Sequence, residues 1–269
     1  MADSVVADTT KAAAEVLKAV PVYQDAIQPV AQEVGKSLKT IGGVINVALS
    51  PLAAMVYGFE IIKVQLKERL EKKLSKTPPE NIITPKLQLV GPLIDNYKYV
   101  HDCEDLSEMF VNLLAKAMDK DQVKKAHPSF VRIITELSPD EARLLKLISS
   151  ELVLPKLDIK SVDPKDASAG FDYLYINFSN LGERAELTYP ELTPSYLSNL
   201  ERLNIISCPV NSLGNSYANT EVYKELEDHP MISALQEEYK KIGKEIETEK
   251  RIIEKTDFGK LFLNAVLTN

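Results

Sequence analysis

The clearest pattern in the chain is a run of apolar residues spaced three or four positions apart in its first third. This spacing lines side chains along one face of an α-helix, whose period is about 3.6 residues. The members of the run are Ile41, Ile45, Ala48, Leu52, Met55, Phe59, Ile62, Leu66 and Leu70. Pro51 lies within the run, and proline removes one helical hydrogen bond. The pattern therefore predicts one long helix kinked near Pro51, or two helices that meet there.

Residues 40–59 contain no charged side chain and are apolar on nearly every helical face. A helix of about twenty residues is about 30 Å long, which matches the hydrocarbon thickness of a bilayer. The stretch is therefore either the core of a helical bundle or a segment that enters a membrane. The charged continuation to Leu74 favours a packed resting state, from which membrane entry is conditional. The residues expected to contact lipid or a partner helix are Ile41, Val44, Ile45, Ala48, Leu49, Leu52, Met55, Val56 and Phe59.

The middle of the chain alternates between a connector and helices. Four prolines fall within residues 77–93, so we expect a mostly extended connector there. An amphipathic helix follows around Leu106–Ala117. Another ends near Thr135, and Ser138 followed by Pro139 predicts a further helix start, with serine as the cap and proline in the first turn.

Beyond residue 150 the pattern changes, because short apolar runs such as FDYLYINF replace long helical periodicity. A short helix from Pro194 to Leu203 leads directly into the strand-like run NIISCPV, and a short helix follows near the C-terminal end. This order is typical of a winged helix, whose helices often bind DNA. The candidate contact face of that domain comprises Tyr196, Asn199 and Arg202.

Together these patterns predict a mainly α fold with a C-terminal α+β domain that resembles a winged helix. We expect three parts. They are an N-terminal helical segment over residues 1–78, a helical core over 79–150 and an acidic winged-helix-like domain over 151–269.

The net charge of -7 is unevenly distributed along the chain. Residues 1–78 carry ten basic and eight acidic side chains, a balance of +2. Residues 79–150 carry nine and eleven (-2), and residues 151–269 carry thirteen and twenty (-7). Because lysine and arginine supply most affinity for phosphate backbones, the acidic C-terminal part weighs against nucleic-acid binding. Only the N-terminal segment suits an anionic lipid surface.

No arrangement of residues identifies a catalytic, cofactor-binding or metal-binding site. The three histidines are separated, and His101 beside Asp102, Cys103 and Glu104 fits a helix start better than a metal cluster. Cys103 and Cys208 have the spacing of free thiols in a reducing compartment. The first residues lack the features of a signal peptide, so we expect a cytoplasmic protein, with possible association at the inner membrane.

Six blocks of sequence resemble one family of bacterial proteins, abortive infection alpha (Abi-alpha), long known as a domain of unknown function. They are YQDAIQPVAQEVGKSL (23–38), LSPLAAMVYGFEIIK (49–63), PPENIITPKLQLVGPLIDNYKY (78–99), LSEMFVNLLAKAMD (106–119), AHPSFVRIITELSPDEARLL (126–145) and TDFGKLF (256–262). The resemblance implies a role in bacterial defence against phage, by killing or arresting the infected cell. It supplies no catalytic residues.

Three hypotheses about function follow. The first is a non-enzymatic anti-phage protein that acts through conditional membrane insertion of its N-terminal helical segment. The second is a soluble regulatory or scaffold protein that acts by oligomerisation or partner binding. The third is a toxin enzyme that targets RNA or DNA. We expect a protein partner or self-association, no cofactor, and a phage-derived trigger that the sequence does not identify.

Overall fold

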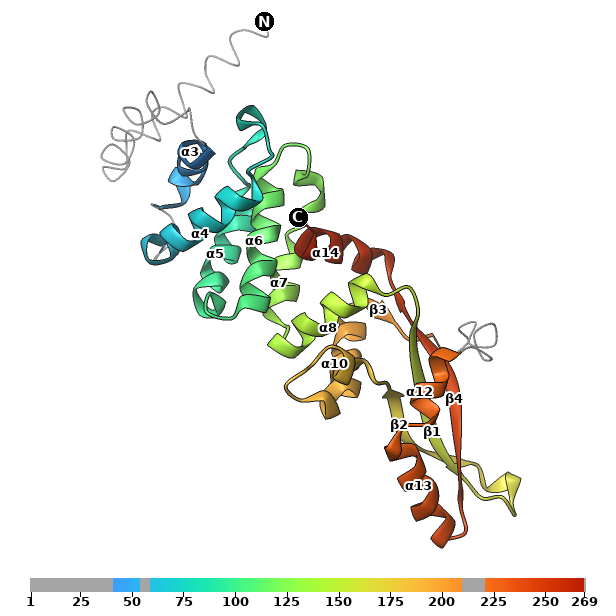
Figure 1. The fold of residues 1–269 in the computed structure, drawn as a ribbon. Coiled ribbons are helices and arrows are strands. Elements are labelled where there is room, and N and C mark those ends of the chain that lie inside the picture. The colour runs from blue at the N-terminus through green and yellow to red at the C-terminus, as the bar shows by residue number, and fades with distance from the viewer. Residues whose placement is uncertain (1–40, 54–58, 210–220, 269) are drawn as a thin grey trace, which may run out of the picture. The chain divides into compact units, whose positions relative to one another are not determined.

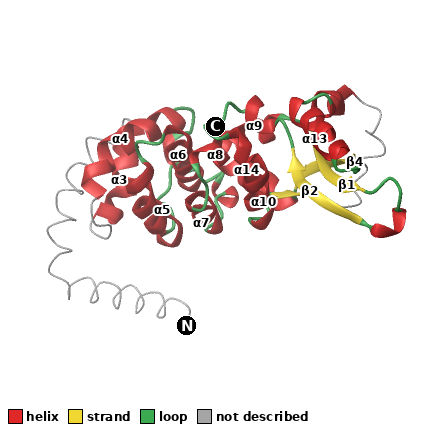
Figure 2. Ribbon diagram, turned by 90° about the horizontal axis from the view of Figure 1, so that it is seen from below, coloured by secondary structure: helices red, strands yellow, loops and turns green. Residues whose placement is uncertain are grey.

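The computed structural model describes residues 41–53, 59–209 and 221–268 and is mainly helical, with one four-stranded sheet (Figures 1 and 2). The chain divides into two compact units. Of the described residues, unit 1 holds 41–53, 59–102 and 110–131, and unit 2 holds the rest. The predicted division into three parts stays a prediction. Its boundary near residue 150 falls inside unit 2.

The described part of unit 1 begins with two helices, α3 (Ile41–Ala53) and α4 (Phe59–Lys73), which pack against each other. Near the start of α3, a methyl group on Gly42 would meet the side chain of Glu71, near the end of α4. The two helices therefore run antiparallel, with Ile45 and Leu66 fully buried. Of the two predicted alternatives, the structure has two helices, although α3 continues through Pro51. Residues 1–40 of the predicted N-terminal segment lie outside the described residues.

The segment predicted to be an extended connector is instead largely helical, and that prediction is wrong. A short 3-10 helix, η1 (Pro79–Asn81), precedes α5 (Leu87–Val100), which contains Pro92. A proline inside a helix costs about 3 kcal/mol. This is outweighed because α5 buries one apolar face, made of Leu89, Val90, Leu93, Ile94 and Tyr97. Burial of each such side chain contributes about 1.5 to 3 kcal/mol.

Helix α6 (Glu104–Met118) and helix α7 (Ser129–Thr135) supply residues to both units, with η2 (Val123–Lys125) between them. Within unit 1, Asp119 connects the end of α6 to the segment that follows α4. Its Oδ2 atom accepts a hydrogen bond from the hydroxyl of Thr77 at 3.1 Å, and its backbone forms a bridge with Ile82.

The first helix that lies wholly in unit 2 is α8 (Pro139–Ser150), whose start was predicted from Ser138 and Pro139. The Ser138 hydroxyl accepts from the Glu141 amide at 3.2 Å, and the Glu141 carboxylate accepts from the Ser138 amide at 2.6 Å. This reciprocal capping box satisfies two amides that the helix itself leaves unpaired. The other helices among the described residues of unit 2 are α9 (Leu181–Arg184), α10 (Thr193–Arg202), α12 (Lys224–Glu227), α13 (Pro230–Lys241) and α14 (Asp257–Leu267), with 3-10 turns η3 (Ala167–Ala169), η4 (Pro190–Leu192) and η5 (Glu221–Tyr223).

The sheet of unit 2 is antiparallel with strand order β2-β1-β4-β3. Its strands are β1 (Leu154–Val162), β2 (Phe171–Phe178), β3 (Ile206–Ser207) and β4 (Glu245–Lys255). The long strands β1 and β4 pair along nine residues, whereas β3 pairs with β4 over two. Strand β2 therefore forms one edge of the sheet.

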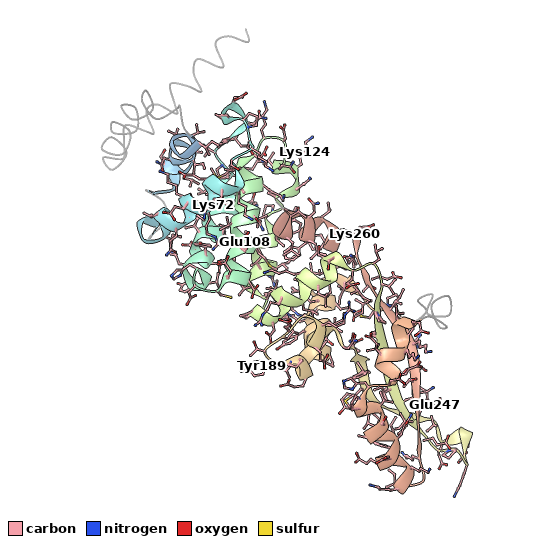
Figure 3. All side chains as sticks on the ribbon, in the orientation of Figure 1. Lys72, Glu108, Lys124, Tyr189, Glu247 and Lys260 are labelled. Atoms are coloured by element: carbon pink, nitrogen blue, oxygen red, sulfur yellow. The ribbon has the colours of Figure 1, made fainter. Side chains whose placement is uncertain are left out.

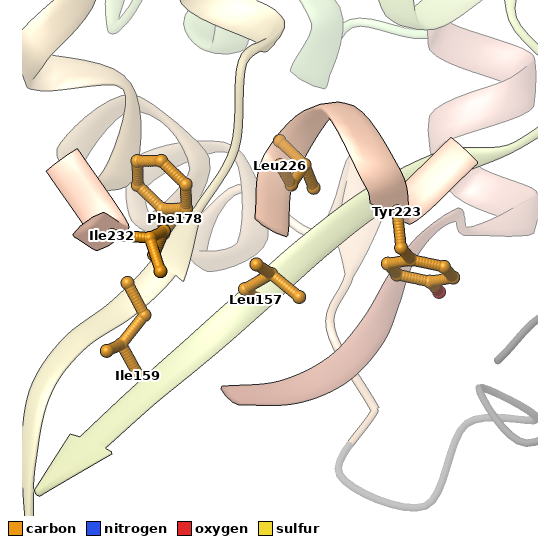
Figure 4. Packing of buried hydrophobic residues seen from close by; sticks show 6 residues of the cluster. All are labelled: Leu157, Ile159, Phe178, Tyr223, Leu226 and Ile232. Carbon is orange, nitrogen blue, oxygen red and sulfur yellow. The ribbon is translucent and has the colours of Figure 1, made fainter. Parts of the chain in front are cut away.

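One face of the sheet is apolar and is covered by the short helices that connect β3 to β4. Figure 4 shows the core, in which β1 and β2 contribute Leu157, Ile159 and Phe178. The covering side chains are Tyr223, Leu226 and Ile232. The Tyr223 hydroxyl reaches across and donates to the Arg251 carbonyl on β4 at 2.9 Å.

The likeness to a winged helix stays a prediction. As expected, α10 leads directly into the short strand β3. The connection from β3 to β4, however, carries η5, α12 and α13, whereas a winged helix has a small hairpin wing there. The sheet also includes β2, and the predicted winged helix assigned no strand to that segment.

Candidate functional site

The residues predicted to contact lipid or a partner helix all belong to unit 1. Four of them, Val44, Ile45, Ala48 and Leu49, are buried, and Ile41 is half-buried. Leu52 and Phe59 belong to α3 and α4, whereas Met55 and Val56 lie outside the described residues. Among the helices that the structure describes, none is long and apolar enough to cross a membrane.

The residues predicted as a winged-helix contact face all bind groups at or just before the start of α8. The Tyr196 hydroxyl donates to Asp140 Oδ2 at 3.2 Å. The Asn199 amide donates to Glu141 Oε1 at 2.6 Å and to the Glu136 carbonyl at 3.2 Å. Arg202 Nη2 contacts Glu136 Oε2 at 2.6 Å. The structure therefore brings the three predicted residues together, with their polar groups occupied inside unit 2.

Asp140 is the centre of this α8–α10 junction. Its carboxylate, 4% exposed as a residue, accepts from the amides of Thr188 and Tyr189 at 3.0 Å each and pairs with Arg143 Nη2 at 2.7 Å. Burial alone would raise the pKa of Asp140, but these hydrogen bonds outweigh burial and lower it. Burial, followed by the neighbouring Asp140, raises the pKa of Tyr196 to about 12. The Asp140 carboxylate is thus held by two backbone amides, the Tyr196 hydroxyl and Arg143, which is typical of a structural contact.

The three histidines each bond to a neighbouring group of their own segment. His127 accepts from the Ser129 amide at 3.2 Å at the start of α7, and His229 accepts from the Met231 amide at 3.2 Å as the cap of α13. His101 Nδ1 lies 3.0 Å from the Lys98 carbonyl. Each of these contacts is explained by local turn and cap geometry.

The thiol of Cys208 lies near the charges of β1. Burial first, and then Glu201, raises the pKa of Cys208 to about 11, so the thiol is protonated at neutral pH. A protonated thiol is a poor nucleophile. Within the part of the chain that the structure describes, no group of three or more histidine, cysteine, aspartate or glutamate side chains could hold a metal ion.

The sheet face opposite the apolar core is polar, and the part of this face near the start of β1 is buried. Lys156 Nζ contacts Asp158 Oδ1 at 2.9 Å, and both residues are buried. The Asn177 amide also donates to Asp158 Oδ1, at 3.0 Å, from a left-handed backbone with φ of 66°. Asparagine tolerates that conformation better than most residues. Arg251 on β4 completes the cluster, with its Nε 3.6 Å from Asp158 Oδ2.

Farther along this face, Lys160 lies between two glutamates of β4. Its Nζ is 3.2 Å from Glu247 Oε2 and 3.2 Å from Glu249 Oε1. Burial would lower the pKa of Lys160, but the bonds to Glu249 and Glu247 outweigh it and raise the pKa. Figure 3 labels Glu247 on this part of β4. The polar face thus pairs its cations internally and leaves no positive surplus for a phosphate backbone.

Strand β2, at the outer edge of the sheet, carries four exposed apolar side chains. On β2, Phe171 is 52% exposed, Tyr173 45%, Tyr175 40% and Ile176 54%. We call these four residues the aromatic edge. The rings of Phe171 and Tyr173 pack edge to face at 5.1 Å. Within the described residues, no other segment is hydrogen-bonded to the side of β2 that faces away from β1.

The sequence contained a signal for this edge. FDYLYINF was recognised as a short apolar run, but its alternating aromatic residues were not singled out as a candidate contact surface. The signal was incomplete because an aromatic strand is exposed only if it lies at the edge of its sheet. That position depends on the pairing of β1 with β4, whose residues are far apart in the sequence.

An unpaired strand edge with exposed aromatic residues can bind a β-strand of another protein. Unpaired amides and carbonyls of an edge template pairing with another chain. Aromatic side chains are enriched at protein interfaces. The arrangement therefore suits a protein contact better than a chemical reaction.

Three comparisons place the chain among known proteins. The model of a family described as abortive infection alpha matches residues 58–266. No curated protein matches the chain. One solved structure with a similar chain is an uncharacterized protein from the hydrocarbon-degrading marine bacterium Alcanivorax borkumensis SK2, with 19% sequence identity and a TM-score of 0.33. The alignment covers 55% of this chain and 96% of that one, and a likeness this weak carries no argument.

Proposed function

The chain belongs to the abortive infection alpha family, and from this premise we propose that it acts in bacterial defence against phage as a non-enzymatic protein that binds another protein through the aromatic edge. The proposed site of action is the cytoplasm. The resemblance found in the sequence, confirmed by the family match, supplies the biological context, and the geometry of β2 supplies the mode of action.

One observation carries the proposal, namely that β2 is an edge strand with four exposed apolar side chains. Natural proteins protect exposed edges with lysine, proline, bulges or a covering segment, since an open edge pairs with other chains. The eight residues of β2 contain no lysine, arginine, proline or glycine, and the only such protection is the irregular pairing of β2 with β1 on both sides of Ile159. An edge left open and lined with aromatic side chains is therefore expected to be used for binding.

The ionisable side chains support a non-enzymatic role. An active nucleophile or general base has a pKa matched to neutral pH. Burial instead moves the pKa of Cys208 to about 11 and that of Tyr196 to about 12, which keeps both groups protonated. The nearby carboxylates, such as Asp140, are already bonded to backbone amides and an arginine.

Conditional membrane insertion remains a second candidate, because α3 consists of thirteen residues without a charge. In the described arrangement Val44, Ile45, Ala48 and Leu49 of α3 are buried, so these side chains would have to be uncovered before they met lipid. Fractionation of infected cells tests this candidate. Membrane insertion requires the full-length protein to move to the membrane fraction after infection and to resist extraction at high salt. A protein that stays in the soluble fraction throughout refutes it.

Phage plating efficiency tests the proposed function. We compare wild type with Tyr175→Lys, which places a charge on the aromatic edge, and with Tyr189→Lys as the matched control. Tyr189 is 55% exposed in unit 2, precedes η4, and lies away from the sheet, as its label in Figure 3 shows. At equal protein levels, Tyr175→Lys should lose protection and Tyr189→Lys should keep it. Full protection by Tyr175→Lys would refute the proposal.

A further inference from the structure

We infer that a group of lysines in unit 1 binds a small anion that carries phosphate. They come from the end of α4, the end of α6 and η2, and Figure 3 labels one of them, Lys124. We call Lys73, Lys116, Lys120, Lys124 and Lys125 the lysine corner. It lies in unit 1, whereas the aromatic edge lies in unit 2. The inference therefore goes beyond the proposed function and is tested separately from it.

Hydrogen bonds hold the segments of the lysine corner together. The hydroxyl of Thr77, just after α4, donates to Asp119 at the end of α6. The Lys120 amide donates to the Asn81 carbonyl at 2.9 Å, which fixes the same two segments a second time. The η2 turn follows at once, because the Val123 amide donates to the Asp119 carbonyl at 2.8 Å. The lysines thus come from segments that are fixed relative to one another.

The lysine corner has a surplus of positive charge. Residues 116–125 contain four lysines and two aspartates, a balance of +2, in a chain whose net charge is -7. Both carboxylates already accept from other donors. Asp119 Oδ1 accepts from the Asp121 amide at 2.9 Å, and Asp121 Oδ2 accepts from the Asn81 side chain at 3.0 Å. Within the part of the chain that the structure describes, none of the four lysines forms an ion pair.

The sheet of unit 2 pairs its lysines, in contrast to this corner. Lys156 and Lys160 each have a carboxylate oxygen at 3.2 Å or closer. Such pairs explain why those cations are compatible with a folded sheet. An unpaired surplus of lysine has no such explanation, and a local positive field attracts anions even in a protein that is acidic overall.

Lys116 is the member of the lysine corner that most needs a partner. It is only 7% exposed, yet no hydrogen-bond acceptor contacts its ammonium group among the described residues. A buried charge without a partner is costly. Burial first, and then Lys125, lowers the pKa of Lys116; Asp119 opposes this and Lys73 adds to it. A bound anion would supply the missing partner and offset the repulsion between the lysines.

The clustering of lysines favours phosphate over carboxylate as the bound group. Each ammonium is a compact charge with three donor hydrogens, and lysine is a common ligand of phosphate. A phosphate monoester carries about two negative charges at neutral pH and three acceptor oxygens, so several ammonium groups can bind it at once. A carboxylate carries a single charge. The ligand is therefore a phosphate group, either on a small soluble molecule or on a lipid headgroup.

Isothermal titration calorimetry of the full-length protein with inorganic triphosphate tests the inference. Lys116→Met removes the charge and keeps an apolar chain in the buried position. It should weaken binding by about tenfold or more, as expected for the loss of a charge-assisted hydrogen bond. Lys98→Met is the matched control in unit 1, because Lys98 already pairs with Asp95 at 2.8 Å. The control should bind triphosphate as wild type does.

Thermal unfolding separates a binding role of Lys116 from a structural one. Without triphosphate, Lys116→Met should melt at the temperature of wild type or above it, because the variant no longer buries an unpaired charge. Triphosphate should raise the melting temperature of wild type and of Lys98→Met, since a ligand that binds the folded state stabilises it. It should raise that of Lys116→Met much less. Lys125→Gln, at an exposed position, gives the same comparison if Lys116→Met does not fold.

Cosedimentation with vesicles distinguishes a soluble phosphate from a lipid headgroup. The vesicles consist of phosphatidylcholine with or without phosphatidic acid, whose headgroup is a phosphate monoester. Binding that requires phosphatidic acid and Lys116, without binding of triphosphate, assigns the site to a lipid headgroup. Binding of triphosphate without binding of vesicles assigns it to a soluble ligand. Binding of neither probe by wild type, or an equal loss in Lys116→Met and Lys98→Met, would overturn the inference.

Discussion

Replacing Asp140 measures how strongly the α8–α10 junction is held. In Asp140→Ala the amides of Thr188 and Tyr189 lose their acceptor, and Arg143 loses its partner at 2.7 Å. Leaving each of the two amides unsatisfied costs about 1 to 3 kcal/mol, whereas Arg143 is 31% exposed and keeps Asp105 and Thr188 as partners, so the loss of its pair with Asp140 adds about 1 kcal/mol or less. Because these contributions overlap, we expect a loss of about 4 kcal/mol in the free energy of unfolding of unit 2. Asp140→Asn keeps one acceptor oxygen and should lose about 2 kcal/mol.

Urea unfolding followed by far-UV circular dichroism measures this loss, since the chain has no tryptophan for fluorescence. With a slope of about 2 to 3 kcal/mol per molar urea, 4 kcal/mol lowers the midpoint by about 1.5 M. Asp166→Asn is the matched control. The Asp166 carboxylate accepts from the Ser168 amide at 2.9 Å at the exposed tip between β1 and β2, so its loss should leave the midpoint nearly unchanged.

The pH dependence provides a second test of Asp140. Its pKa in the folded state is lowered, so the unfolded chain takes up the proton first as the pH falls. The stability that Asp140 contributes is therefore complete above its unfolded pKa of about 4 and is lost as the pH falls through the folded value. Asp140→Asn should show a shallower loss of stability in this acidic range. An equal loss in both proteins, or a cost below about 1 kcal/mol for Asp140→Ala, would contradict the assigned role.

Three further predictions concern other residues of unit 2. Gly259→Ala should lower the free energy of unfolding by about 2 to 3 kcal/mol in urea titration, because a methyl group there would collide with the Ile205 carbonyl; a wild-type midpoint would contradict the packing of α14. Tyr196→Phe should flatten the loss of stability between pH 10 and about 12, where the unfolded tyrosine ionises and the folded one does not, since its pKa is raised to about 12; an unchanged alkaline limb would refute this. Cys208 should react with iodoacetamide at neutral pH about a hundredfold more slowly than free cysteine, as judged by mass spectrometry, because its pKa is raised to about 11; a rate like that of free cysteine would count against its burial.

Local signals in the sequence predicted the helix and strand starts that depend on neighbouring residues. The start of α8 at Ser138 and Pro139 and the passage from α10 into β3 were foreseen for this reason. The helix through Pro92 was missed, because the five buried side chains of α5 that outweigh the proline are visible only in the folded unit. Helix propensity is a weak guide where tertiary packing decides.

For the candidate surfaces, too, the sequence predicted what depends on neighbouring residues and missed what depends on contacts between distant ones. Tyr196, Asn199 and Arg202 were correctly placed on one helix, but their acidic partners at Glu136, Asp140 and Glu141 lie more than fifty residues away in the chain. No spacing rule could pair them. The exposure of β2 likewise follows from the order of the strands, which residues 245–255 help to determine.

A photo-crosslinking amino acid placed at position 175 in infected cells tests the central claim most directly. The same amino acid at position 189 is the control. The account predicts a covalent adduct between position 175 and a second protein, heavier than one 30.0 kDa chain and identified by mass spectrometry, and no such adduct from position 189. No adduct from position 175, or the same adducts from both positions, would contradict a specific protein contact at the aromatic edge.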